Sequence, residues 1–280
     1  MNRAFKSRRQ ASLMPNYVVL SLLAFFALAP LVILGFNALK STAEVAQNPL
    51  GPPSGLLFSN FPKAWRVGEF ATTTRNSAIL VIGTVLGELT LGGLAAYSLA
   101  RLNPRGSNLL MLYLLVVSTV PVWLFLVPLF FLWRTIGLLN TRLGLTLIYI
   151  ALNAPFAIFL LRSYMVKLPS DFEDAARVDG ANEWQVLTKV VLPLAWPGFL
   201  TVGLVVALSV WSEYQLALIF MNDPQMFTVA TSYSKFASRF SRDWSLTSAA
   251  AVMMLAPILV LFLALQRRFI EGLTQGGLKG

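Results

Sequence analysis

The sequence predicts an all-helical membrane protein with six transmembrane segments, from its composition, its long apolar runs and the placement of its charges. Hydrophobic residues make up 56% of the 280-residue chain and charged residues 12%, and the mean hydropathy is +0.68, values outside the range of soluble domains. Several apolar runs reach the roughly 20 residues that a helix needs to cross a bilayer. Lys and Arg crowd at the ends of these runs, so the net charge of +10 indicates a protein that faces lipid rather than nucleic acid.

The apolar runs define the expected spans. A basic start, MNRAFKSRRQ, precedes the first run, which is about twice as long as the apolar part of a signal peptide and lacks a small-x-small cleavage site, so we expect it to be retained. The small residues Gly87, Gly92 and Gly93 of the second run predict close helix packing, and Pro121 and Pro128 of the third predict a kink. The expected spans are residues 17–39, 76–99, 108–133, 143–161, 197–220 and 248–265.

Six spans place both termini on one side of the membrane. On the side that holds the termini there are 13 Lys and Arg, against 9 on the other side. Positively charged loops favour the cytoplasmic side, so we expect both termini to be cytoplasmic. Residues 266–280 form a cytoplasmic tail, and its polar, glycine-rich end, residues 272–280, is expected not to pack as a helix.

A polar, acid-rich segment separates the fourth and fifth expected spans, at residues 168–193 (LPSDFEDAARVDGANEWQVLTKVVLP). Ser170 followed by Glu173 is the pattern of a capping box, which predicts a helix start. Gly180 breaks this helix and Asn182 can cap a second one. The segment therefore predicts two short helices joined by a tight bend, a rigid unit rather than a flexible loop.

Helical periodicity assigns faces to these two helices. Phe172, Ala175, Ala176 and Asp179 share one face of the first helix, which we expect to point inward, and its other face carries the charged residues Glu173, Asp174 and Arg177. The second helix carries an apolar stripe made of Trp184, Leu187 and Val191. Periodicity alone also fits an amphipathic helix pair that lies on the membrane surface.

The order of residues in this segment resembles the EAA loop of ABC importer permeases, by which such subunits engage their cytoplasmic ATPases. The resemblance rests on Asp174-Ala175-Ala176, Gly180 after three residues, and Val190-Val191-Leu192-Pro193 after nine more. Asp174 stands where the family usually has Glu, which keeps the charge. Asp179-Gly180-Ala181 and Leu192-Pro193-Leu194-Ala195 look like the sugar-importer branch, the maltose-type second permease subunit. The coupling residues that this resemblance implies are Glu173, Asp174, Ala175, Ala176, Arg177, Asp179, Gly180 and Ala181.

Residues that could perform catalysis are few. The chain has no cysteine and no histidine, which excludes thiolate nucleophiles, His-containing triads and Cys or His metal sites. It contains no Gly-x-x-x-x-Gly-Lys-Ser/Thr motif, so we expect no catalytic residue, metal or cofactor in this chain and no ATP hydrolysis. The resemblance implies that ATP and Mg are bound by two cytoplasmic ATPase subunits. It also implies a second related permease, an extracytoplasmic sugar-binding protein and an inner (plasma) membrane location.

Two acidic residues fall within expected spans, Glu88 and Glu213, and a carboxylate at membrane depth is costly unless it pairs or faces a cavity. The run Trp211-Ser212-Glu213-Tyr214 resembles the Trp-Asn-Glu-Phe element of sugar permeases, with Ser212 in place of Asn. Aromatic faces beside hydrogen-bonding groups suit sugars. The expected substrate path comprises Glu213, Trp211, Tyr214, Ser212, Asn153 and Glu88, although Glu213, Glu88 and Asn153 could also serve only in helix packing.

Other functions remain open at the level of sequence. An ion-coupled secondary transporter would use Glu88 and Glu213 as proton or sodium sites. An intramembrane enzyme is disfavoured, because no Ser-Lys or paired-carboxylate arrangement falls on one face. A polyol or glycerol phosphate would be as compatible with the sequence as a sugar. The tail that starts at Gly272 resembles the ending of maltose-type permeases, which implies that it reaches toward the ATPases.

Overall fold

The computed structural model describes residues 14–240 and 243–277, and every regular element in these ranges is a helix. The chain divides into two compact units, each with its own contacts. Unit one comprises Met1–Gly68 and Tyr233–Leu255, and unit two comprises Glu69–Ser232 and Ala256–Gly280. The basic start (residues 1–13) and the end of the tail (278–280), both of which carry sequence expectations, lie outside the described residues.

Unit one is organised around a buried lysine. It contains α2 (Met14–Ala38), α3 (Thr42–Gln47), α4 (Asn60–Val67), most of α15 (Val229–Arg239) and the start of α16 (Trp244–Gly277). The Lys40 ammonium donates to Asn37 Oδ1 at 3.1 Å and to the Asn48 carbonyl at 2.7 Å, which satisfies a charge that is fully shielded from solvent. The Asn60 amide donates to the carbonyls of Ala38 and Lys40, so α4 is fixed to the end of α2.

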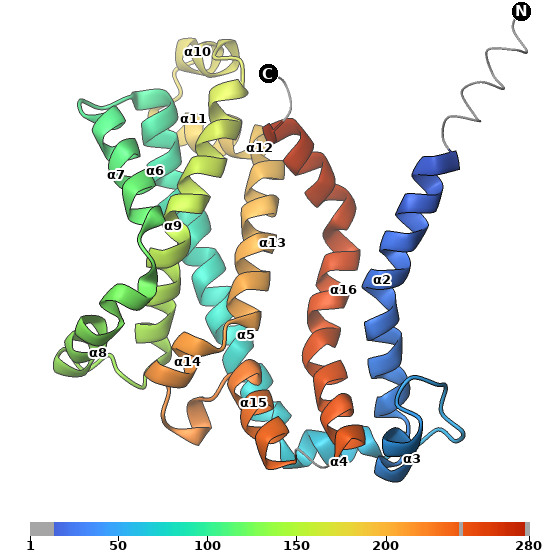
Figure 1. Ribbon diagram of the computed structural model, residues 1–280. Coiled ribbons are helices and arrows are strands. Elements are labelled where there is room, and N and C mark those ends of the chain that lie inside the picture. The colour runs from blue at the N-terminus through green and yellow to red at the C-terminus, as the bar shows by residue number, and fades with distance from the viewer. Residues whose placement is uncertain (1–13, 241–242, 278–280) are drawn as a thin grey trace, which may run out of the picture. The chain divides into compact units, whose positions relative to one another are not determined.

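Unit two is built on three long helical segments that run side by side (Figure 1). The first consists of α5 (Phe70–Gly87), η1 (Glu88–Gly92), α6 (Gly93–Tyr97) and η2 (Ser98–Leu102), where η1 and η2 are π-helical. The other two are α9 (Arg142–Lys167) and α13 (Trp196–Ser212). Their buried apolar side chains, among them Leu80, Leu161, Phe199 and Val202, form the core.

Glycines allow these helices to approach closely, as the small-residue pattern predicts. A Cβ atom at Gly93 would lie 2.9 Å from the ring of Phe199 in α13, and a Cβ at Gly198 would lie 2.7 Å from the ring of Tyr164 in α9. Both contacts are shorter than van der Waals packing allows, so a larger residue would push the helices apart. The predicted close packing of the second span is therefore confirmed at Gly93.

Shorter helices lie at the two ends of this bundle. The predicted kink at Pro121 is present as an 86° bend between α7 (Ser107–Thr119) and the segment of η3 (Val122–Phe125) with α8 (Leu126–Thr135). At one end lie α10 (Asp171–Val178) and α11 (Glu183–Val186), followed by η4 (Leu187–Val191) and α12 (Leu192–Leu194). At the other end lie α8 and α14 (Gln215–Phe220), with η5 (Pro224–Met226) after it (Figure 1).

Among the described residues, four helices are long and apolar enough to cross a membrane, or up to six if each of two bent pairs is one span. The chain is thus an all-helical, multi-pass membrane protein. Two expected boundaries are wrong. The segment expected at 197–220 is not one helix, because α13 ends at Ser212 and Glu213 is extended. The tail is helical as far as Gly277, because α16 continues from its apolar part without a break.

Candidate functional site

The segment of residues 168–193, hereafter the coupling segment, forms the predicted helix, bend and helix. Gly180 has φ +86°, a backbone conformation that glycine adopts without strain. Gly180 N–H donates to the Arg177 carbonyl and Ala181 N–H donates to the Ala176 carbonyl, the two hydrogen bonds of a Schellman motif. Asn182 caps α11 with a complete capping box, in which Gln185 reciprocates. The bend is therefore fixed by hydrogen bonds at both helix ends.

The predicted cap at the start of α10 and the predicted faces of α10 are wrong, and the apolar stripe of the second helix is buried only in part. Ser170 makes no side-chain capping bond. Phe172 is exposed and Glu173 is buried, the reverse of the expected faces, because Glu173 pairs with Arg101 of η2. Leu187 and Val191 are buried as predicted, whereas Trp184 of the same stripe is exposed.

Five side chains join the coupling segment to the end of the helix made of α5, η1, α6 and η2. Arg101 Nε of η2 lies 2.6 Å from Glu173 Oε1, and Tyr97 Oη donates to Glu183 Oε2 at 2.7 Å. Arg177 Nε donates to Glu183 Oε1 at 2.8 Å, and its Nη2 lies 3.5 Å from Glu173 Oε2. These contacts form a chain from Tyr97 to Arg101, and the helix backbone between Tyr97 and Arg101 closes it into a ring. We call this set the polar ring; its members are Tyr97, Arg101, Glu173, Arg177 and Glu183.

Charge and burial differ around the polar ring. The side chains of Arg101 and Glu173 are 12% and 4% exposed, so this ion pair is largely shielded from solvent. The Arg177 guanidinium, which hydrogen-bonds Glu183, holds the pKa of that carboxyl below its usual value, and the Tyr97 hydroxyl adds to the effect. The same hydrogen bond raises the pKa of Arg177. Arg177 also donates to Asp174 Oδ1 at 2.8 Å, on the exposed side of α10.

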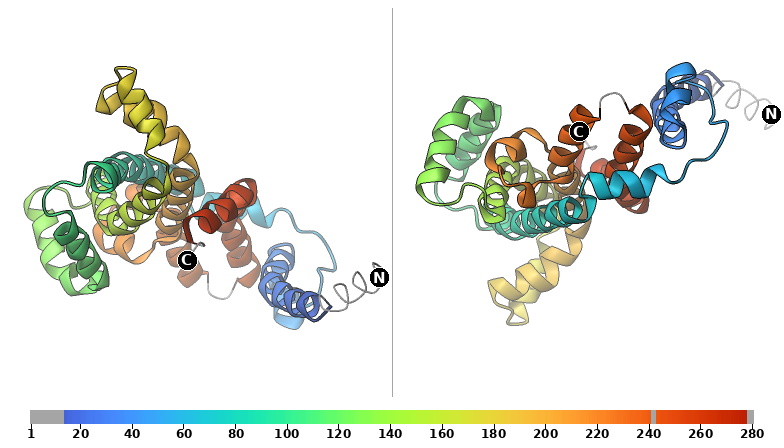
Figure 2. Two further views of the ribbon diagram at one scale, coloured as in Figure 1. Left: turned by 90° about the horizontal axis from the view of Figure 1, so that it is seen from above. Right: turned by 90° about the horizontal axis from the view of Figure 1, so that it is seen from below.

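Three large apolar side chains of the coupling segment are exposed: Phe172, Val178 and Trp184. They lie in the part of the chain that projects sideways from α5, α9 and α13 when the bundle is viewed along its axis (Figure 2). Val178 is 88% exposed, and Asp174, Ala175 and Asp179 share this exposed region. The surface thus combines apolar side chains with two acids.

Of the expected substrate-path residues near the end of α13, Glu213 caps the next helix, α14. Glu213 Oε1 accepts from Leu216 N–H at 2.8 Å, its Oε2 accepts from Ala217 N–H at 3.0 Å, and Tyr149 Oη donates to Oε2 at 2.6 Å. The carboxylate therefore satisfies the free amides at the start of α14. Ser212 donates to the carbonyl of Leu208, and Trp211 is buried.

The remaining path residues follow one face of α9. Asn153 lies one turn from Tyr149 and donates to its carbonyl at 2.8 Å. One turn further along α9, Ala157 packs against Gly92 of η1. A Cβ atom built on Gly92 would lie 3.3 Å from Ala157 Cβ and 3.3 Å from Glu88 Oε2, so Glu88 lies at the same level as Ala157. Glu88 is fully buried, and neither of its oxygens has a hydrogen-bond partner in the described part of the chain. Glu213, Asn153 and Glu88 therefore mark three successive levels along α9 rather than one cluster.

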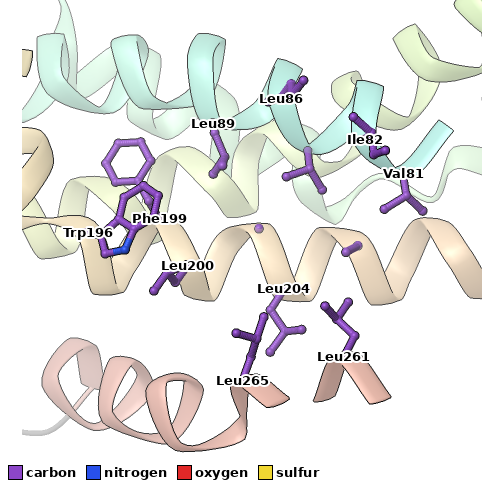
Figure 3. Close-up of a pocket in the computed structure, with 13 residues that line it drawn as sticks. Val81, Ile82, Leu86, Leu89, Trp196, Phe199, Leu200, Leu204, Leu261 and Leu265 are labelled. Carbon is purple, nitrogen blue, oxygen red and sulfur yellow. The ribbon is translucent and has the colours of Figure 1, made fainter. Parts of the chain in front are cut away.

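An apolar cavity of about 320 Å³ lies between α5, α13 and the second half of α16 (Figure 3). Its lining includes Val81, Leu89, Phe199, Leu204 and Leu261. The indole N–H of Trp196 is the one polar side-chain group among the lining residues. A sugar needs several hydrogen-bonding partners, so this cavity suits hydrocarbon and not a sugar.

Sequence reasoning missed Tyr97, Arg101, Tyr149 and Glu183. Tyr97 and Arg101 are four residues apart, a spacing that places them on one helix face, and this was the available signal. Tyr149 is a polar group in an otherwise apolar run, and such a hydroxyl requires a partner when buried. No local pattern links Glu183 to Tyr97, because the contact joins two distant parts of the chain.

Comparisons with known proteins identify related chains. Residues 88–275 match the family model described as binding-protein-dependent transport system inner membrane component. The diacetylchitobiose uptake system permease protein of Streptomyces coelicolor is 32% identical over 98% of this chain and 90% of its own length. The trehalose transport system permease protein of Mycobacterium tuberculosis is 34% identical over 93% of this chain and 95% of its own.

A solved structure has the same fold. It is a chain in the crystal structure of a bacterial ABC transporter involved in the import of the acidic polysaccharide alginate. That chain is 25% identical to this one, with a TM-score of 0.79, and the match covers 96% of this chain and 99% of that one. The similarity thus extends over almost the whole of both chains.

Proposed function

Because this chain belongs to the family of binding-protein-dependent transport system inner membrane components and is a permease subunit of an ABC importer, not an enzyme, we propose that it forms half of the translocation path for a sugar. The coupling segment is the part that receives force from cytoplasmic ATPase subunits, where ATP and Mg are bound. A second related permease completes the path, and an extracytoplasmic binding protein delivers the sugar.

The geometry of the coupling segment carries this proposal. Its two short helices are locked by the Gly180 turn and the Asn182 cap, so the segment can move as a rigid body. Its exposed surface presents Phe172, Val178 and Trp184 beside Asp174. Apolar anchors with adjacent charge are typical of protein interfaces, and a lipid surface would instead favour basic residues around the apolar ones.

The membrane arrangement follows from the same proposal. The bent pair of α7 with η3 and α8 counts as one span and α13 without α11 and α12 as another, which with the four long helices gives six spans. Both termini then lie on the cytoplasmic side with the coupling segment. The excess of Lys and Arg on that side supports this orientation. Glu213, Trp211, Tyr214, Ser212, Asn153 and Glu88 are proposed to border the path.

The substrate that we propose is a neutral di- or oligosaccharide. Support comes from relatives named for diacetylchitobiose, trehalose and arabinooligosaccharides. The competing substrate class is an acidic saccharide. Its support is a relative named for sulfoquinovosyl glycerol and a similar solved structure named for alginate. Stimulation of the ATPase by the binding protein loaded with one sugar at a time distinguishes these classes.

Charge reversal in the coupling segment tests the proposal. In proteoliposomes that contain this chain, the second permease and the ATPases, Asp174→Lys is expected to reduce ATP-driven uptake at least tenfold, because it reverses an exposed charge at the interface. Glu69→Lys makes the same change at the far end of α5 and serves as the control. Full uptake by the Asp174→Lys complex would contradict the proposed role of this surface.

A further inference from the structure

The coupling segment connects directly to two of the three long helical segments of unit two. Its first residues follow α9 through Leu168, and its last residues lead through η4 and α12 into α13. The helix that comprises α5, η1, α6 and η2 has no such covalent connection to it. Any movement of the coupling segment reaches that helix through non-covalent contacts.

Tyr97 and Arg101 provide these contacts. Tyr97 is the last residue of α6 and Arg101 lies four residues further in the π-helical η2, so the two side chains lie on the same side of the helix. Each side chain binds a different helix of the coupling segment: Arg101 binds Glu173 of α10, and Tyr97 binds Glu183 of α11. Arg101 Nη2 also donates to the Leu168 carbonyl at 2.7 Å, where the coupling segment begins.

Arg177 closes the arrangement from within the coupling segment. It bonds Glu183 of α11 and contacts Glu173 of α10, the same two carboxylates that Tyr97 and Arg101 hold. Each carboxylate is therefore shared between one cation of the coupling segment and one group of the second span. A closed set of contacts resists shear more than separate pairs do, because one contact cannot slide without straining the others.

The helix that Tyr97 and Arg101 belong to is not a regular α-helix. It contains two π-helical stretches, η1 and η2, and such stretches are frequent at functional sites. The buried, unpartnered carboxyl of Glu88 lies in η1, on the same helix. A displacement of η2 would thus be transmitted along a helix whose hydrogen-bond register is already irregular.

We infer that the polar ring is the coupling between the ATPase-driven segment and the second membrane span, with Tyr97 and Arg101 as positioning residues. This inference rests on the proposed function, since it assigns how the force received by α10 and α11 enters the membrane. The ring makes α10, α11 and the η2 end of the helix one rigid body. Loss of the ring leaves the ATPase docked but frees the second span from its movement.

The test is the number of sugar molecules transported per ATP hydrolysed by the reconstituted complex. Tyr97→Phe removes its hydrogen bond to Glu183, and Glu183→Gln removes the carboxylate that binds both Tyr97 and Arg177; both variants preserve side-chain shape. Each is expected to lower this ratio at least threefold, while the ATPase subunits stay bound and the melting temperature changes little. The double variant is expected to be no worse than Glu183→Gln alone, because Glu183→Gln already disrupts the contact that Tyr97→Phe removes. Tyr113→Phe, which removes an exposed hydroxyl from α7, is the matched control.

A covalent replacement gives a second readout. The chain has no cysteine, so Tyr97→Cys with Glu183→Cys introduces a unique pair that a bifunctional thiol reagent can join. The joined variant is expected to regain the ratio that the unjoined variant loses. An unchanged ratio in both single variants, or multiplicative losses in the double variant, would overturn the inference. If the wild-type chain retains no ATPase subunit, the proposed function fails instead.

Discussion

Glu173 and Asp174 are neighbours in the sequence with the same charge but opposite environments. The Glu173 side chain is 4% exposed and paired with Arg101, whereas that of Asp174 is 66% exposed. Removal of one partner of a buried ion pair leaves an uncompensated charge, which costs about 3–5 kcal/mol. An exposed pair contributes about 0–1 kcal/mol.

We therefore expect Glu173→Ala to destabilise the purified chain by about 3 kcal/mol or more, and Asp174→Ala by less than about 1 kcal/mol. Reversible denaturation in mixed detergent micelles measures both. Equal losses in the two variants would show that the Arg101–Glu173 pair is not buried in the folded protein.

Glu88 is fully buried, and neither of its carboxylate oxygens accepts a hydrogen bond from the described residues. An ionised carboxylate in such a site costs several kcal/mol, whereas an amide of the same shape carries no charge. Glu88→Gln is expected to leave the free energy of unfolding within about 1 kcal/mol of wild type. A much larger loss would mean that the charge of Glu88 is used, as an ion-coupled transporter requires.

Glu183 predicts a pH dependence. Its pKa in the folded protein lies below the ordinary value of 4.5, chiefly because Arg177 hydrogen-bonds it. A lowered folded-state pKa adds stability above pH 4.5, and this stability is lost as the pH falls through the folded pKa. The difference in melting temperature between wild type and Glu183→Gln should be constant from pH 6 to 8 and vanish in acid. A difference that instead disappears near neutral pH would rule out the Arg177 contact as its source.

At the scale of elements, a substitution at Gly180 would introduce backbone strain without steric crowding. No atom lies within 4 Å of a Cβ built there, so the cost of substitution comes from φ +86° alone. A left-handed conformation costs an ordinary L-residue about 1–2 kcal/mol, and Asn less.

Transport per ATP is therefore expected to fall in the order Gly180, Asn, Ala when position 180 is varied, with melting temperatures in the same order. Gly35→Ala in α2 is the control, since Gly35 also has open space around it but lies within a helix. If Ala and Asn were equivalent at position 180, the left-handed turn would not be what fixes the two helices.

Local sequence signals predicted the Gly180 bend, the Asn182 cap and the bend at Pro121, because each depends on residues a few positions apart. The faces of α10 could not be predicted in this way. Arg101, on a different helix, draws Glu173 inward and leaves Phe172 outside, which reverses the apolar periodicity. The break at Glu213 was missed for a related reason, since its carboxylate is fixed by Tyr149 of α9.

At the scale of the whole molecule, composition was sufficient to predict an all-helical membrane protein. The proposed substrate path is harder to derive from the sequence, because the polar residues that we propose for it lie at separate levels along α9 and, in this proposal, a second permease completes the path. The substrate class rests on the relatives for the same reason.

Topology can be tested with single cysteines in a chain that has none. Leu56→Cys, in the segment between α3 and α4, is expected to react with a membrane-impermeant maleimide in intact cells that lack an outer membrane barrier. Val178→Cys is expected to react only in inside-out vesicles. Reaction of both sites from the same side would contradict the six-span arrangement.

The most direct measurement is thiol cross-linking of Val178→Cys to the ATPase subunit in the assembled transporter. Val178 is the most exposed apolar side chain of α10, so a short cross-linker should join the two proteins in high yield, and the yield should change when nucleotide closes the ATPases. Cross-linking to lipid alone, or to a protein on the outer side of the membrane, would contradict the account.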